Sequence, residues 1–209
     1  MGRRNEHTQE QQREMALSAA ELLVVKEGIA GFSMRKVAKA IGYTVGNLYL
    51  LFANQDDLLA SIGERTADQI YASLVAATEM NDDARGKLRA ISLAYIEFAQ
   101  KHPNRFRMMF EHQLPDDMKD RPSLDRRLHR LFQLVEDNLK PLLPGARADR
   151  LRATAAALWS GVHGVCTLAV SGKLAWSGVR DYRALCNAVV DTFLEGLGKG
   201  GISVSHRRA

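Results

Sequence analysis

Apolar residues recur every three or four positions through almost the whole chain, and this spacing constrains the fold more than any other feature. The clearest example is one helical face formed by Leu88, Ile91, Tyr95 and Phe98. No stretch of useful length alternates apolar and polar residues as a half-buried strand does. Five prolines in 209 residues leave room for long helices. The sequence therefore predicts an all-α protein.

Capping residues and glycines divide the first part of the chain into four helices. Residues 8–11 have the form of a capping box ahead of a first helix. Ser33 and Thr44 can each cap a short helix, and Gly42 between them permits a tight turn because it has no Cβ. Asn54, followed by two acidic residues, is typical of the start of a long fourth helix.

Five further helices follow from the apolar spacing. The fifth ends at His102-Pro103, because the residue before a proline avoids helical angles. A short helix rich in aromatic residues and methionine then runs to about His112. The stripes of the last three helices span residues 124–139, 151–165 and 182–193. The tail, residues 198–209, is rich in Gly, Ser and Arg and is predicted to be disordered.

Composition narrows the compartment and the partners. The formal charge of +5 suits a polyanionic partner, although most mildly basic proteins bind no nucleic acid. Cys166 and Cys186 have no metal-ligand or redox-motif spacing, which predicts two free thiols in a reducing cytoplasm, with a redox switch as the alternative. The start of the chain is too charged for a signal peptide. Residues 153–172 lack charge, but their polar residues and glycines favour a buried helix over a membrane span.

The sequence offers little for catalysis. It has no Ser/His/Asp or Cys/His signature, no glycine-rich phosphate loop and no run of metal ligands, and its six histidines are scattered. The pair Asp116-Asp117 lies in a polar loop, where solvated acids are the simplest interpretation. We therefore expect no enzyme activity, no cofactor and no metal site.

Residues 32–52 have the pattern of a helix-turn-helix, with two short helices flanking Gly42. Apolar side chains from both helices can pack inward, namely Val37, Ala38, Ile41, Leu48 and Phe52. Three polar groups, Thr44, Asn47 and Tyr49, remain on a second helix of the right size for a DNA major groove.

This segment resembles the DNA-binding domain of the TetR family. The family motif runs Thr/Ser, then Ile/Val-Ala, then Gly, then Gly-x-Leu-Tyr-x-x-Phe before a capped fourth helix. Its parts here are Ser33, Val37-Ala38, Gly42 and the run from Gly46 through Leu48 and Tyr49 to Phe52. The match covers about residues 8–60 and implies a double-stranded DNA operator as partner.

The resemblance also implies roles, position by position. Ser33 and Tyr49 stand where the family contacts phosphates, and Arg35 stands where members can place a base-reading side chain. The leading end of the recognition helix is formed by Thr44, Val45, Gly46 and Asn47, and Gly46 lets the backbone approach DNA closely. Local alternatives stay open: Ser33 and Thr44 can be helix caps only, and Tyr49 can be a core residue only.

Two departures from the family pattern predict modest electrostatic affinity for DNA. The family often has a lysine just before the fourth helix, where this chain has Gln55. The recognition helix carries no charged residue, and residues 1–52 hold seven basic residues against five glutamates. Arg3 and Arg4 can supply part of the missing attraction.

The C-terminal half carries a second resemblance. The run Trp159-Ser-Gly-Val-His-Gly164 is similar to the Trp-His-Gly signature of one TetR subgroup, and its Pro-x-x-Phe partner occurs at residues 103–106. This match implies a ligand-responsive regulator. Candidates to line an effector pocket are Tyr95, Phe98, Phe106, Met109, Phe110, Phe132, Trp159 and His163. The alternative is that most of them form the core and that His163 is a satisfied structural histidine.

Glycines in the penultimate helix point to close packing. Gly161 and Gly164 each cost about 1 kcal/mol relative to alanine, which the approach of another helix can offset. In the TetR family the last two helices of each subunit form a four-helix dimer interface. The resemblance therefore implies a homodimer whose interface buries the apolar helix of residues 153–170.

These observations predict a helix-turn-helix DNA-binding domain over residues 1–52 and a ligand-binding and dimerisation domain over residues 53–197. The expected function is that of a homodimeric repressor that a small apolar or aromatic effector releases from a pseudo-palindromic operator. One alternative is a DNA-binding regulator without a small-molecule effector, or one that responds to a protein partner. Another is a helical ligand carrier or small enzyme.

Overall fold

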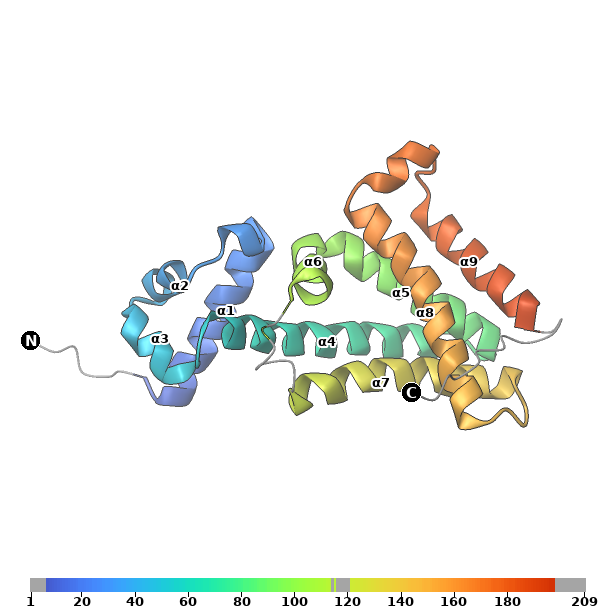
Figure 1. Ribbon diagram of the computed structural model, residues 1–209, viewed down its shortest axis with the longest axis horizontal. Helices are drawn as coiled ribbons and strands as arrows, with labels where there is room; N and C mark the ends of the chain where they lie inside the picture. Colours follow the sequence, from blue (N-terminus) through green and yellow to red (C-terminus); the bar gives the residue numbers. More distant parts are fainter. Residues whose placement is uncertain (1–6, 114, 116–120, 198–209) are drawn as a thin grey trace, which may run out of the picture. The chain divides into compact units, whose positions relative to one another are not determined.

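The structure, a computed structural model, is described for residues 7–113, 115 and 121–197. Within them every regular element is helical, which confirms the all-α prediction (Figure 1). The α-helices are α1 (Gln9–Glu27), α2 (Met34–Ile41), α3 (Val45–Leu51), α4 (Gln55–Glu79), α5 (Ala84–Lys101), α6 (Pro103–Glu111), α7 (Pro122–Leu139), α8 (Ala148–Val170) and α9 (Tyr182–Leu197). Short 3-10 helices are η1 (Ile29–Gly31), η3 (Lys140–Leu142) and η4 (Lys173–Ser177).

The predicted caps are present. Thr8 forms the full capping box with Gln11 at the start of α1. Ser33 and Thr44 each accept a hydrogen bond from the backbone N–H three residues ahead, both at 3.3 Å. Gly42 adopts the left-handed conformation at φ +75°, which a residue with a Cβ rarely adopts. Local sequence therefore determines where α1, α2 and α3 begin and where α2 ends.

The chain divides into two compact units. The first is built from residues 1–67 and 102–125, and the second from residues 68–101 and 126–209. The predicted boundary between residues 52 and 53 is one between functional domains, whereas the two compact units are defined by contacts. The predicted boundary therefore stays a prediction. The predicted tail at residues 198–209 lies outside the described residues.

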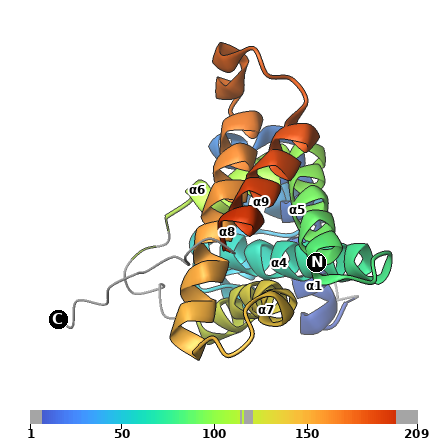
Figure 2. The ribbon, with the colours of Figure 1, turned by 90° about the vertical axis from the view of Figure 1, so that its right-hand side faces the viewer.

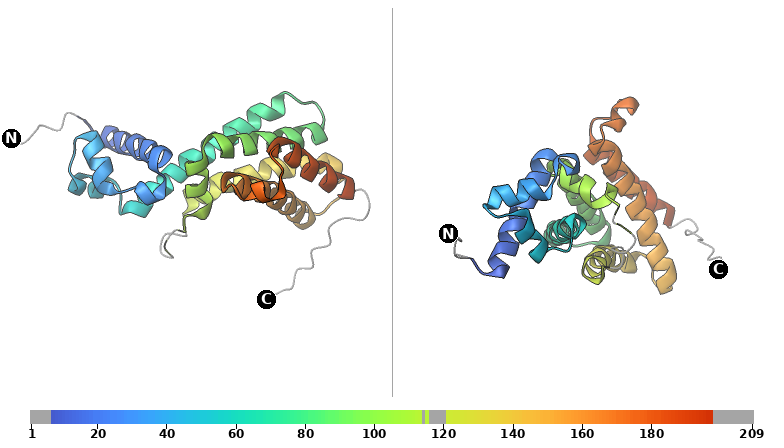
Figure 3. Two further views of the ribbon diagram at one scale, coloured as in Figure 1. Left: turned by 90° about the horizontal axis from the view of Figure 1, so that it is seen from above. Right: turned by 60° about the vertical axis from the view of Figure 1, so that its left-hand side comes forward.

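The first unit has one hydrophobic core. In it α1 packs against α2, α3 and α6, and α2 packs against α3 (Figure 3). Side chains from all of these helices and from the start of α4 are buried together, among them Ala16, Val24, Val37, Leu48, Phe52, Leu58, Ile62 and Met108. Among the described residues of this unit Arg105 is a buried charged side chain: it is 4% exposed, and its Nη1 lies 2.9 Å from Oε1 of Glu21. A buried charge of this kind is stable only when it is paired.

In the second unit α5, α8 and α9 pack against one another (Figure 2). Their facing side chains are buried, including Leu88, Tyr95, Leu158, Val162, Cys166, Cys186, Val190 and Leu194. Among the described helices α8 alone is long and apolar enough to cross a membrane, and a third of its most apolar window is buried. The sequence predicted a buried helix here. The structure buries one side of it and exposes the other, where Ser160 and Gly161 lie.

Candidate functional site

The helices α2 and α3 form the predicted helix-turn-helix. Val37 and Leu48 are fully buried, and Phe52 is 1% exposed at the end of α3. The turn between the helices is closed by the backbone N–H of Tyr43, which donates to the carbonyl of Ala38 at 3.0 Å. Apolar contacts on the inner face therefore hold α3 in place and leave its outer face toward solvent.

Most of the predicted DNA-facing residues lie on the accessible side, and Val45 is the exception. Arg35, Thr44 and Gly46 are exposed, and Tyr49 is 53% exposed. Tyr49 is therefore not a core residue, which removes the alternative interpretation of its role. Ser33, Asn47 and Val45 are half-buried, and Val45 packs against the core.

Thr44 holds the start of α3 and the side chain of Asn47 together. Its hydroxyl accepts the backbone N–H of Asn47 at 3.3 Å and donates to Oδ1 of Asn47 at 2.7 Å. This arrangement fixes the Asn47 amide with Nδ2 as its donating end. Capping and DNA contact are compatible in one threonine, because the cap orients the residue that follows it on the outer face.

Gly46 lies next to open space. A Cβ built on Gly46 would meet only the hydroxyl oxygen of Thr44, at 3.7 Å. Packing within the chain therefore does not require glycine here. The close approach of DNA to the backbone at Gly46 stays a prediction, with which the open space beside this residue is compatible.

The sequence interpretation overlooked Leu50, which is 75% exposed on α3. Tyr49 and Leu50 lie three and four positions after Gly46, so the three residues share the outer face of the helix. An exposed leucine next to DNA-facing groups is suited to contact a thymine methyl group. The sequence already indicates this position of Leu50, because Leu50 follows Gly46 by four residues on the same helix.

The basic residues of α2 differ in how readily their charges can contact DNA phosphates. Lys36 Nζ lies 2.6 Å from Oε2 of Glu27 and 2.7 Å from the carbonyl of Gly31, and this lysine lowers the pKa of the Glu27 carboxyl. Arg35 and Lys39 are exposed. The positive charge available for DNA phosphates on α2 therefore comes mainly from Arg35 and Lys39.

Part of the predicted effector cluster comes together in the second unit. The hydroxyl of Tyr95 on α5 lies 3.0 Å from Nδ1 of His163 on α8. The His163 ring stacks on Trp159, with ring centroids 4.6 Å apart, and Trp159 also contacts Phe132 of α7 at 5.2 Å between centroids. Burial lowers the pKa of His163 and raises that of Tyr95, so both side chains are neutral near pH 7.

The remaining candidates lie elsewhere. Phe106 and Phe110 are neighbours on α6 in the first unit, with ring centroids 4.9 Å apart, and Met109 between them is half-buried. Phe98 is 6% exposed in the core of the second unit. A single pocket that contains all of the predicted effector residues therefore stays a prediction.

An apolar groove runs between α8 and α9 on the surface of the second unit. It has a volume of about 420 Å³ and is lined by Ala157, Leu158, Gly161, Ala188, Val189, Thr192 and Phe193. A Cβ on Gly161 would lie 3.0 Å from Cγ1 of Val189, which is tighter than an ordinary contact, so a larger residue would require Val189 to shift. The helix that lies close to Gly161 in this structure is α9 of the same chain, and packing of Gly161 against a second copy stays a prediction.

Cys166 of α8 and Cys186 of α9 are both buried, and their thiols are within hydrogen-bonding reach of each other. The hydrogen bond with Cys186, together with burial, raises the pKa of Cys166, whereas the same bond lowers that of Cys186. Their separation in the sequence gave no sign of this contact.

Two family models match most of the chain. The model described as "Bacterial regulatory proteins, tetR family" matches residues 16–62. The model described as "Tetracyclin repressor-like, C-terminal domain" matches residues 88–193. The first covers the helix-turn-helix, and the second extends from the second turn of α5 through most of α9.

Individual proteins agree with these matches. Nucleoid occlusion factor SlmA of Edwardsiella ictaluri (strain 93-146) is 27% identical over 143 residues, which are 68% of this chain and 71% of SlmA. A protein of unknown function from Rhodococcus sp. RHA1 has a TM-score of 0.76 at 24% identity, over 93% of this chain and 98% of that one. FadR from Bacillus subtilis, solved in complex with stearoyl-CoA, has a TM-score of 0.65 at 17% identity, over 88% of this chain and 98% of the FadR chain. The likeness to these two structures is one of fold.

The exposed outer face of a correctly capped α3, the Gly42 turn and the two family matches agree with one another. This chain belongs to the TetR family of DNA-binding transcriptional regulators.

Proposed function

We propose that the protein is a homodimeric cytoplasmic repressor that binds a pseudo-palindromic DNA operator and leaves it when a small apolar or aromatic effector binds. The outer face of α3 carries this proposal. There Tyr49 and Leu50 are exposed, Gly46 lies next to open space and Arg35 is accessible on α2. A helix of this size with polar and apolar groups on one side fits a major groove.

The α8/α9 groove supports a dimer. Its lining is mostly small and apolar, and it lies on the side of α8 that the chain itself leaves uncovered. Burying such a surface against the same surface of a second copy gives a two-fold interface in which each groove receives its counterpart. Two copies then present two α3 helices to successive major grooves, which requires two half-sites about one helical turn apart.

The cluster of Tyr95, Trp159 and His163 supports an effector site in the second unit. Flat aromatic surface with one directional hydrogen-bonding group is suited to a small apolar or aromatic molecule. FadR, which has the same fold, was solved with stearoyl-CoA, so long acyl groups belong in any ligand screen. An effector that prefers one spacing of the two α3 helices shifts the dimer toward it, and operator affinity falls accordingly.

The deciding experiment is selection of genomic DNA fragments by the purified protein, followed by fluorescence-anisotropy titration of the selected duplex and an unrelated duplex. We expect the selected duplex to bind at least about a thousand-fold more tightly and to contain an inverted repeat. Equal binding of both duplexes would contradict sequence-specific regulation and favour a helical ligand carrier or enzyme.

Dimerisation and the effector are tested separately. Sedimentation equilibrium of the free protein should give twice the chain mass of 23.2 kDa. Candidate effectors, including acyl-CoA and aromatic compounds, are then titrated into the operator complex. Release by one class supports the effector proposal. Specific operator binding that no compound changes would favour a regulator that responds to a protein partner.

A further inference from the structure

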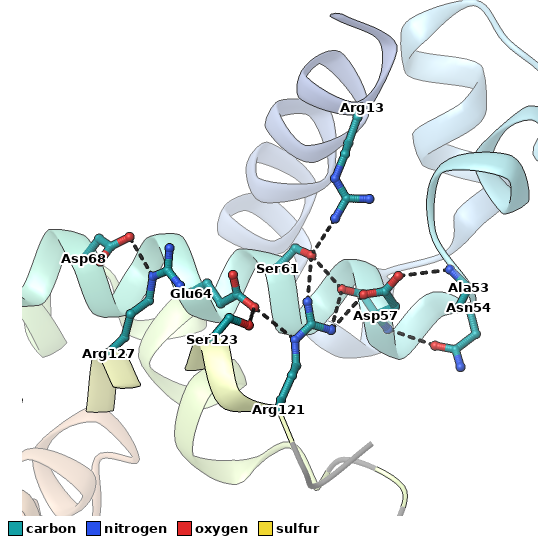
Figure 4. A network of polar contacts seen from close by, with 10 residues as sticks. All are labelled: Arg13, Ala53, Asn54, Asp57, Ser61, Glu64, Asp68, Arg121, Ser123 and Arg127. Carbon is teal, nitrogen blue, oxygen red and sulfur yellow. Dashed lines mark hydrogen bonds and ion pairs between the residues drawn. The ribbon is translucent and has the colours of Figure 1, made fainter. Parts of the chain in front are cut away.

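Ser61, on the second turn of α4, is a hydroxyl shared by two arginines from distant parts of the sequence (Figure 4). Its Oγ accepts from Nη2 of Arg13 at 3.4 Å and from Nη2 of Arg121 at 3.3 Å. The same hydroxyl donates to the backbone carbonyl of Asp57 at 2.9 Å, and Ser61 is only 5% exposed. One buried side chain therefore connects α1, α4 and the residue that precedes α7.

Arg13 extends this connection to the recognition helix. Its Nη1 donates to the carbonyl of Leu51, the last residue of α3. Its guanidinium lies over the ring of Phe52, 4.1 Å from the ring centroid. The last carbonyls of a helix have no partner within the helix, so Arg13 satisfies one of them and holds the end of α3.

Arg121 approaches the same end of α3 through Asp57. Nη1 of Arg121 lies 2.7 Å from Oδ1 of Asp57, and its Nε lies 3.0 Å from Oε1 of Glu64. The other carboxylate oxygen of Asp57 accepts the backbone N–H of Ala53 at 3.0 Å, and Ala53 directly follows Phe52. The backbone on both sides of Phe52 is thus held, by Arg13 before it and by Asp57 after it.

The network contains two arginines and two carboxylates, so its charges balance, and its ion-paired side chains are mostly buried. The side chains of Arg121, Asp57 and Glu64 are 19%, 20% and 17% exposed. Burial raises the pKa of the Asp57 carboxyl, but the Ala53 N–H and the Arg121 guanidinium outweigh it and leave that pKa below its usual range. The rigid planar fork of arginine fixes both acids in one geometry, which a flexible ammonium group cannot do.

We propose that Arg121 is a positioning residue for DNA recognition, which fixes the C-terminal end of α3 through Asp57 and Ser61. The Thr44 cap fixes the start of α3, so the position of its C-terminal end determines the direction in which its outer face points. Reading of base edges requires groups held within about 0.5 Å, and loss of one anchor is enough to disturb it. This inference rests on the proposed DNA binding by α3 and adds a residue outside the helix-turn-helix.

The test compares Arg121→Gln with Arg127→Gln. Arg127 of α7 also pairs with an acid of α4, with its Nε 2.9 Å from Oδ2 of Asp68, and Asp68 lies eleven residues after Asp57, which is about three helical turns further from α3. Operator affinity, affinity for unrelated duplex, melting temperature and amide hydrogen exchange of Phe52 and Ala53 are measured for both variants. Ser61→Ala is a milder variant, which keeps both arginine–acid pairs and removes only the shared hydroxyl.

We expect Arg121→Gln to weaken operator binding about three- to thirty-fold and to leave the affinity for unrelated DNA within about twofold. Exchange at Ala53 should be faster in Arg121→Gln and unchanged in Arg127→Gln. Ser61→Ala should show a smaller change in the same direction. If Arg121→Gln does not fold, Ser61→Ala provides the same comparison.

Equal operator affinities of the two arginine variants would overturn the proposal. So would equal losses on operator and unrelated DNA that simply follow the melting temperature. If the wild type shows no specific DNA binding, the proposed function fails. Amide hydrogen exchange then still tests whether Arg121 fixes the C-terminal end of α3. Faster exchange at Ala53 in Arg121→Gln alone would then support the fixing of α3, and unchanged exchange would overturn it.

Discussion

The hydroxyl of Tyr95 and Nδ1 of His163 lie 3.0 Å apart and join α5 to α8 within the second unit. His163 also stacks on Trp159, so the polar group in this apolar helix has both a hydrogen-bond partner and an aromatic neighbour. The same geometry serves a histidine that only maintains the structure and a histidine that also contacts an effector. Substitution of His163 distinguishes the two roles: loss of a structural histidine lowers stability, whereas loss of an effector contact weakens the response to the ligand.

His163→Ala tests the effector role. If the effector binds at this cluster, the substitution should weaken the ligand response by about 1–3 kcal/mol and leave ligand-free operator affinity intact, because a directional hydrogen bond is lost. Operator affinity with and without ligand and the melting temperature are measured on one sample. His129→Ala, at an exposed position on α7 outside this cluster, is the matched control and should change neither quantity. A destabilised His163→Ala protein with normal induction would instead identify a structural histidine.

The low pKa of His163 predicts a pH dependence of stability. Burial lowers its pKa in the folded state, so the unfolded chain binds this proton more readily as the pH falls through about 6.5. Folding stability should therefore fall as the pH is lowered from about 7.5 to about 5.5. His163→Gln should reduce this slope in thermal unfolding, whereas His129→Gln, at an exposed position on α7, should not. Identical slopes for wild type and His163→Gln would contradict the prediction.

Substitutions at Arg35 and Tyr49 separate base reading from phosphate contact. Arg35→Ala should cost about 1–3 kcal/mol of operator binding and relax specificity at one base position. Tyr49→Phe removes only a hydroxyl from a side chain that is 53% exposed, and it should weaken all sequences evenly. Binding is measured against a set of operators with single base-pair changes. Wild-type affinity in both variants would refute the assignment of these two residues.

Ala157→Arg places a charge in the α8/α9 groove. The half-buried Ala157 lines this groove, so the variant should be monomeric or insoluble, and operator binding should collapse with dimerisation. Gly161→Arg should also disrupt dimers but is less specific, because even a Cβ there lies 3.0 Å from Val189 of the same chain. Light scattering gives the size, and Gln100→Arg on the exposed side of α5 controls for added charge. A monomeric wild type would end the dimer proposal.

The buried thiols of Cys166 and Cys186 should resist modification. Both side chains are 0% exposed, so a thiol reagent should label neither in the native protein and both after unfolding in denaturant. Mass spectrometry counts the labels. Rapid native labelling, or a loss of two hydrogens after mild peroxide treatment, would support the alternative of a redox switch.

The sequence alone determined the helices and most of the residues that α3 exposes to solvent. The caps at Thr8, Ser33 and Thr44 and the turn at Gly42 depend on groups within a few residues of one another, so they can be recognised without knowledge of the fold. The period of 3.6 residues likewise places Tyr49 on a different side of α3 from the buried Leu48. Leu50 was available to the same reasoning.

Only the tertiary structure decided which distant side chains meet. Arg13, Ser61 and Arg121 share one hydroxyl, Tyr95 meets His163, and Cys166 meets Cys186. Their partners lie 20 or more positions away, where no local period or motif applies. Such contacts depend on how helices cross and on which rotamers fit between them, and both are set by packing of the whole core. The exposed residues of α2 and α3 could therefore be predicted from the sequence, whereas the polar network of Arg13, Ser61 and Arg121 near the end of α3 could not.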